Sequence, residues 1–143
     1  MTKKRSKKIS KKRGTRRNKI HKQRGGDDSL LSEMKALVKE GADVNIANDD
    51  GDTPLIMASK EGHVNVVNLL MENGAEVNKA DDNDMTPLHW ASYSGNLEVV
   101  QALLGSEADV NKASNSGETP LRMALMYNHH RIAAVLREAG GHE

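Results

Sequence analysis

Histidine is the residue type in this chain best suited to chemistry, because imidazole binds zinc and transfers protons near neutral pH. Six histidines occur among 143 residues, and His129 and His130 are neighbours. Adjacent residues project in different directions from a helix, whereas a helical zinc pair stands four residues apart on one face. The chain has no cysteine, and no nucleophile–base arrangement or glycine-rich phosphate loop is recognisable. We therefore predict no metal site, no cofactor and no catalytic activity.

The aromatic side chains are better suited to binding another macromolecule. They are few, namely Trp90, Tyr93 and Tyr127. Trp90 and Tyr93 are three residues apart, so they share one face of a helix, and both residue types are enriched where protein interfaces gain most of their affinity. The pattern favours an exposed recognition surface with Trp90 as its anchor. It is also compatible with Trp90 covering a gap left by small neighbouring residues.

Charge divides the sequence into two parts. Residues 1–26 contain 13 Lys or Arg and no acidic residue, whereas residues 27–143 contain the other 8 basic residues and all 20 acidic ones. A segment this basic cannot offset the entropy of ordering by burying apolar surface, so we predict a disordered tail. Its dense clusters are formed by Lys3, Lys4, Arg5, Lys7, Lys8, Lys11, Lys12, Arg13, Arg16 and Arg17.

The basic tail leaves several functions open. Clusters of this kind are typical of a nuclear-import signal that importin reads, or of a polyanion-binding segment. Binding to nucleic acid would be electrostatic and salt-dependent, without recognition of base sequence. The tail could also contact the acidic remainder of the chain, or serve none of these functions.

A repeat of 33 residues organises the remainder of the chain. The tripeptide Thr-Pro-Leu begins at Thr53, Thr86 and Thr119, and an asparagine after Ala-Asp/Glu-Val recurs with the same step. We predict that each threonine caps a short helix whose first residue is proline, and that each asparagine ties a loop by side-chain hydrogen bonds. Gly62 and Gly95 are predicted to end two of these helices in a left-handed conformation. A second apolar helix follows in each unit.

The N-terminal end of the array differs from its middle. Only a second helix is recognisable there, over about residues 29–40, so the first unit is predicted to be half-formed with one apolar face poorly covered. Glu107 stands at the repeat position of Gly41 and Gly74. A left-handed residue other than glycine at this position would cost on the order of 1 kcal/mol, unless Gly105 shifts the turn.

The period and the motifs Thr-Pro-Leu-His-x-Ala and Gly-Ala-Asp-Val-Asn resemble the ankyrin repeat over about residues 29–141. The resemblance implies an all-α solenoid of helix–turn–helix units joined by β-hairpin-like loops. It divides the chain into a disordered basic tail, residues 1–26, and an ankyrin-repeat domain, residues 27–143. Within the domain it predicts a half repeat at 29–48 and full repeats at about 49–81, 82–114 and 115–141.

The resemblance also implies where a partner binds, because partners of ankyrin repeats commonly contact the hairpin tips and the exposed side of the first helices. An acidic rim of tips favours a basic partner, or simply keeps a small domain soluble. The predicted partner-binding residues are Asp49, Asp50, Asp52, Met57, Lys60, Asp82, Asn83, Met85, Trp90, Tyr93, Asn115, Glu118, Met123, Met126 and Tyr127.

Two functions fit these features. The first is a protein–protein interaction module or adaptor, monomeric, with a basic tail for nuclear targeting or polyanion binding. The alternative is a nucleic-acid or chromatin-associated protein whose tail binds phosphates while the repeats recruit a partner. No apolar run is long enough to cross a membrane and no signal peptide is recognisable, so we expect an intracellular location in the nucleus or cytoplasm. The partner's identity does not follow from the fold.

Overall fold

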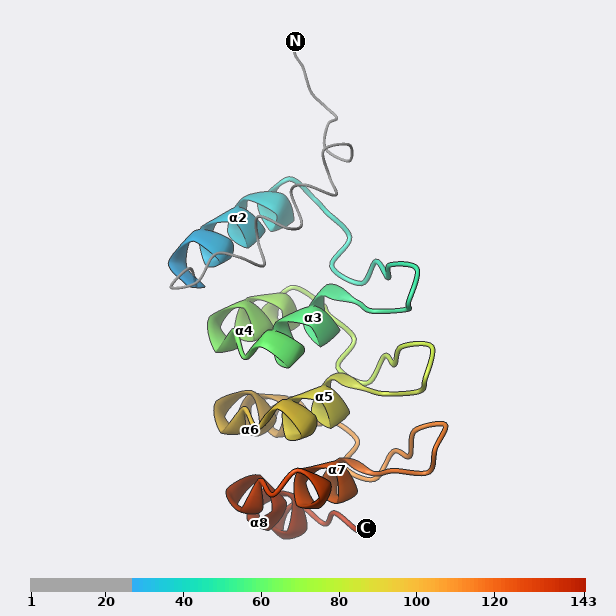
Figure 1. The fold of residues 1–143 in the computed structure, drawn as a ribbon. Coiled ribbons are helices and arrows are strands. Elements are labelled where there is room, and N and C mark those ends of the chain that lie inside the picture. The colour runs from blue at the N-terminus through green and yellow to red at the C-terminus, as the bar shows by residue number, and fades with distance from the viewer. Residues whose placement is uncertain (1–26) are drawn as a thin grey trace.

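The described part of the molecule is a stack of paired helices with a row of loops along one side (Figure 1). The computed structural model describes residues 27–143, and the predicted basic tail, residues 1–26, lies outside them. Within the described residues all regular secondary structure is helical, in the order α2 Asp27–Lys39, α3 Pro54–Glu61, α4 Val64–Glu72, α5 Pro87–Ser94, α6 Leu97–Gly105, α7 Pro120–Met126 and α8 His130–Glu138. The predicted all-α architecture is confirmed.

The first helix of each pair begins at a threonine followed by proline, as the repeat motif predicts. Thr53 Oγ1 accepts a hydrogen bond from the backbone N–H of Ile56 at 3.2 Å, and Thr119 Oγ1 accepts one from Arg122 at 3.2 Å. Such a cap satisfies an N–H group that has no partner within the helix. The helices α3, α5 and α7 therefore begin at equivalent positions of successive repeats.

Left-handed residues turn the chain at the helix ends. Gly62 and Gly95 have φ angles of 78° and 83°, and Asn128 takes their place in the third repeat with φ 62°. Glu107 has φ 67° at the repeat position where Gly74 has φ 94°. Of the two alternatives, Glu107 itself takes the left-handed conformation, in a region that only glycine occupies without a steric penalty.

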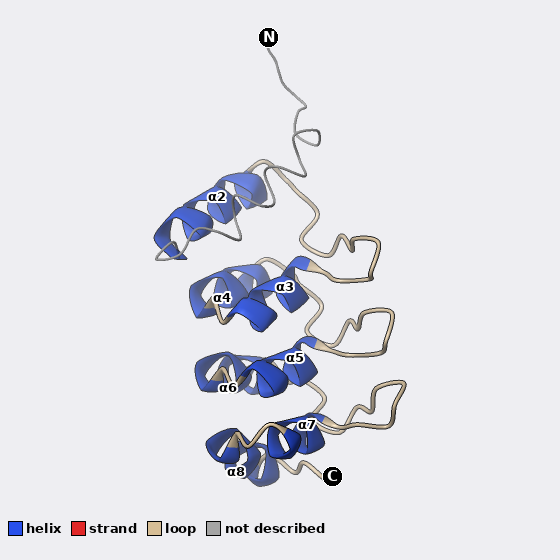
Figure 2. Cartoon of the chain, in the orientation of Figure 1, coloured by secondary structure: helices blue, strands red, loops and turns tan. Residues whose placement is uncertain are grey.

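The loops between repeats project to one side of the stack (Figure 2). Successive tips touch, because the backbone N–H of Asp82 donates to the carbonyl of Asp50 at 3.2 Å. At the base of the loops, Asn45 Nδ2 donates to the carbonyl of Gly74 at 3.1 Å, and its Oδ1 accepts from the N–H of Glu76 at 2.8 Å. These bonds confirm the predicted role of this asparagine and hold neighbouring loops in register.

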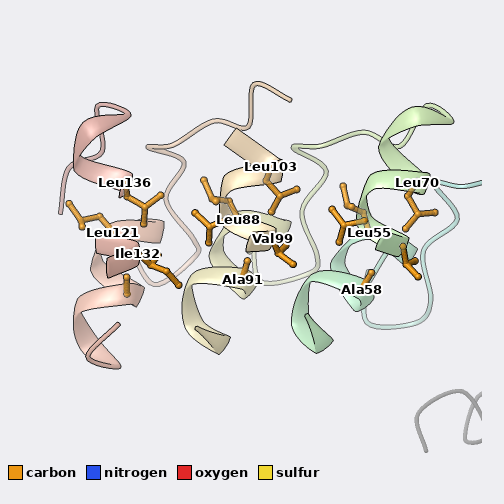
Figure 3. Packing of buried hydrophobic residues seen from close by; sticks show 14 of the residues in the cluster. Leu55, Ala58, Leu70, Leu88, Ala91, Val99, Leu103, Leu121, Ile132 and Leu136 are labelled. Atoms are coloured by element: carbon orange, nitrogen blue, oxygen red, sulfur yellow. The ribbon is translucent and has the colours of Figure 1, made fainter. Parts of the chain in front are cut away.

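The apolar core lies within and between the helix pairs. Alanine at positions 58, 91 and 124 is at most 5% exposed and lets the backbones approach closely. Figure 3 shows the buried leucines that recur from repeat to repeat, each at most 2% exposed: Leu55, Leu70, Leu88, Leu103, Leu121 and Leu136. Because each repeat buries its apolar surface against the next, the core is continuous along the stack.

At the N-terminal end helix α2 stands alone and packs against α4 (Figure 1). It begins at Asp27, two residues before the predicted start, and ends at Lys39, one residue before the predicted end. Its Leu37 is 44% exposed, and Ile46 in the following loop is 63% exposed. The half-formed first unit stays a prediction, because the residues before α2 lie outside the described part of the chain.

Candidate functional site

Most of the predicted binding residues lie at the surface, on the loop tips and on helices α3, α5 and α7. Eight are exposed: Asp49, Asp50, Asp82, Asn83, Tyr93, Asn115, Met126 and Tyr127. Four are half-buried: Met57, Lys60, Trp90 and Glu118. The side of α3, α5 and α7 that carries these residues is called the first-helix face below.

Three predicted binding residues are buried, and the prediction that they face a partner is wrong. Asp52 is 7% exposed, and an ion pair to the Lys60 ammonium at 2.8 Å compensates its carboxylate. Met85 is 7% exposed, its backbone N–H donates to Asp81 Oδ1, and its carbonyl accepts from the backbone N–H of Asp81. Met123 is 6% exposed in α7, which packs between α5 and α8.

The three aromatic rings of the chain contact one another across two repeats. Trp90 and Tyr93 of α5 meet edge to face, with centroids 5.5 Å apart and planes at 88°. Tyr93 meets Tyr127, at the end of α7, with centroids 4.6 Å apart and planes at 80°. These three rings form the ring row. Edge-to-face packing is a favoured aromatic geometry, so the row holds its shape before a partner arrives.

Trp90 is held by polar groups at both its edge and its face. Its indole Nε1 donates a hydrogen bond to Asp81 Oδ2 at 2.9 Å. The Lys60 ammonium of α3 lies 4.3 Å from the ring centroid, which is a cation–π distance. The same ammonium pairs with Asp52. Trp90 is therefore oriented by two residues, Asp81 and Lys60, and only part of its surface is open to solvent.

Asp81 is the functional residue that the sequence interpretation missed. Its Oδ1 accepts the backbone N–H groups of Asn83 and Met85 at 2.9 and 3.0 Å, which closes the loop. Asn48 and Ser114, one repeat before and after, close their loops in the same way. A carboxylate at this repeat position has a second oxygen that is not needed to close the loop. That second acceptor was the signal in the sequence that Asp81 could also bind a donor such as the indole of Trp90.

His89 has a structural place beneath the first-helix face. Its Nδ1 accepts the backbone N–H of Thr86 at 3.1 Å, so Nε2 carries the proton and donates to the carbonyl of Glu118 at 2.8 Å. Burial lowers the pKa of His89 below its ordinary value of 6.5, and the hydrogen bond to Glu118 opposes this shift. A neutral His89 therefore links α5 to the loop of the next repeat.

The geometry agrees with the comparisons to known proteins. The sequence model of ankyrin repeats in three copies matches residues 26–114 and 81–142. This chain belongs to the ankyrin-repeat family. A comparison with curated proteins yields no matching relative.

Ankyrin repeats are generic modules of protein–protein interaction, and this chain carries such a module. Among residues 27–143 no group of three or more His, Asp or Glu side chains is placed to hold a metal ion. Across the same residues no helix has the length and apolar character needed to span a membrane.

Proposed function

We propose that this ankyrin-repeat protein is an adaptor whose partner contacts the ring row and the loop tips beside it. The exposure of Tyr93 and Tyr127, 39% and 44%, is the observation that carries the proposal. Exposed tyrosine is unusual in a chain with only three aromatic residues, and surface aromatic clusters mark contact sites. The proposal assigns the chain no catalytic step.

The side chains of the ring row are held in place by their neighbours, which favours their use as a contact surface. Trp90 is oriented by Asp81 and Lys60, and each tyrosine packs against another ring. Side chains that are already ordered lose little entropy when a partner binds, so more of the contact energy appears as affinity. Met126, which is 50% exposed, adds a flexible apolar contact at the end of the row.

We assign the basic tail to nuclear targeting or to binding a polyanion, and we place the protein in the nucleus or cytoplasm. The support is the sequence of residues 1–26, with its 13 Lys or Arg and no acidic residue. The second candidate function, a nucleic-acid-associated protein, draws on the same observation. It predicts that a peptide of residues 1–28 retains DNA or RNA at low salt and releases it as salt rises.

A capture experiment tests the adaptor function. The full chain and a variant with Trp90→Ala and Tyr93→Ala are used to capture proteins from the same cell extract. The matched control carries Asn68→Ala and Gln101→Ala, two exposed positions on α4 and α6. We expect the ring variant to lose proteins that the control retains, with circular dichroism confirming that all variants are folded. An unchanged set would show that the ring row is not the contact surface.

A further inference from the structure

We propose that the first-helix face binds a lysine- and arginine-rich segment of a partner protein, with cationic side chains lying on Tyr93 and Tyr127. The inference rests on the proposed adaptor function and names the chemistry of its partner. It follows from a contact that the protein makes with itself, from the repeat register and from the charges around the ring row.

Lys60 provides the internal precedent for this chemistry. Its ammonium lies 4.3 Å from the centroid of the Trp90 ring and 2.8 Å from Asp52 Oδ2. The first-helix face therefore already contains a lysine held between an aromatic ring and a carboxylate. This is the arrangement that binds a ligand cation when the protein does not supply one itself.

The repeat register shows where an internal cation is missing. Steps of 33 residues place Tyr93 of α5 and Met126 of α7 at the position of Lys60. Neither residue carries a charge, and within residues 27–143 the contact of Lys60 with Trp90 is the only one between a cation and a ring. The exposed rings of Tyr93 and Tyr127 therefore have no cation over them within residues 27–143, unlike the ring of Trp90.

The surrounding charges favour a cation over an anion. Glu61 is exposed at the end of α3, next in sequence to Lys60, whose ammonium lies over the Trp90 ring. The loop tips add exposed carboxylates at Asp50, Asp82 and Asp84. Across residues 27–143 the ion pair found is that of Lys60 with Asp52, so none of these four carboxylates is paired with a cation of the described part of the chain. Several of them along one side match a segment with several cations, rather than a single ligand.

The fluorescence of Trp90 reports on binding at the first-helix face, because Trp90 is the only tryptophan in the chain and its ring contacts Tyr93. The full chain is titrated at low salt with a short synthetic peptide of alternating arginine and serine while Trp90 emission is followed. The control peptide replaces every arginine with citrulline, which keeps the shape and removes the charge. We expect saturable binding of the arginine peptide, weakened by salt, and no binding of the citrulline peptide.

Substitutions of the two tyrosines test whether the peptide contacts their rings. Tyr93→Leu with Tyr127→Leu removes both rings and should raise the dissociation constant of the peptide about tenfold. Tyr93→Phe with Tyr127→Phe keeps the rings and should change it by less than about twofold. Glu61→Gln should weaken binding about threefold at low salt, and this loss should shrink as salt rises. Circular dichroism reports whether each variant is folded.

Three results would overturn the inference. Equal binding to the leucine and phenylalanine variants would assign the peptide to the acidic tips alone. A salt-dependent change of Trp90 emission without peptide, together with no peptide binding, would identify residues 1–26 of the same chain as the occupant. No response to peptide or salt would exclude a basic partner. In that case the capture experiment still decides whether the ring row binds a partner of other chemistry, so the two proposals fail separately.

Discussion

The two ends of the stack differ in how they bury the same kind of residue. Leu37 in α2 and Leu136 in α8 occupy equivalent positions of the 33-residue repeat, yet the first is 44% exposed and the second 0%. In the C-terminal repeat, α7 packs against α8 (Figure 1). Helix α2 has no such companion among residues 27–143. A repeat position therefore predicts which way a side chain points, but a neighbouring helix decides whether it is buried.

The surface near α2 and the first-helix face also differ in which side chains they expose and in what lies beside them. Near α2 the apolar residues Leu37 and Ile46 are exposed. The first-helix face exposes Tyr93 and Tyr127 although helices lie on both sides of α5. Helix α2 directly follows residues outside the described part of the chain, whereas α5, which carries Tyr93, has described helices on both sides. Only the exposure on the first-helix face supports an argument about binding.

Replacing equivalent leucines by alanine should give the largest difference in lost stability between the N-terminal end and the middle of the stack. Leu103→Ala removes a fully buried side chain and should lower the free energy of unfolding by about 2–5 kcal/mol. Leu37→Ala removes one that is almost half exposed and should lower it by less than about 1 kcal/mol. Urea denaturation of the two variants and the parent chain measures both losses. Equal losses would mean that α2 is covered in solution.

The free energy of unfolding should depend on pH through the inner repeats and not through the half repeat. Residues 29–48 contain no histidine, whereas His89 is buried between repeats. Burial lowers the pKa of folded His89 below 6.5, so the unfolded chain binds a proton at higher pH than the folded one. The free energy of unfolding should therefore fall as pH drops below about 6.5, by at most about 1.4 kcal/mol per pH unit from this group.

The His89 contribution is isolated by comparing the parent chain with His89→Gln at several pH values. We expect the variant to be less stable near pH 7.5 and to lose less further stability on acidification. A variant with the same pH dependence as the parent would show that another group is responsible. His129→Gln is the control, because that histidine is half-buried and its side chain donates to the carbonyl of Tyr93.

The smallest expected change in stability concerns the turn after the second helix, which occurs in the half repeat and in the full repeats. Gly41 and Glu107 both have positive φ, 89° and 67°, after the second helices of the half repeat and of a full repeat. Glu107→Gly should raise the free energy of unfolding by up to about 1 kcal/mol, because the backbone strain disappears. Gly41→Ala should lower it by about 1 kcal/mol. Thermal or urea unfolding checks both signs, and a destabilising Glu107→Gly would show that the side chain compensates the strain.

Much of the fold was predictable because its signals are local. Thr53, Pro54 and Gly62 mark the start and end of α3 through their own backbone preferences, and the 33-residue step repeats that information. The exposure of Tyr93 and Tyr127 was also predictable from helical spacing. The burial of Met85 and Met123 was not, because both stand at positions where the pattern places surface residues.

The sequence by itself determined the repeat, the helices, their caps and the direction in which Trp90 and Tyr93 point. The tertiary structure decided that Asp52 neutralises Lys60, that Asp81 orients Trp90 and that Tyr127 joins the ring row. The physical reason is that these contacts join side chains from different secondary-structure elements, in two cases from neighbouring repeats. Their distances depend on how the helices and loops stack, and no local preference of the backbone specifies them.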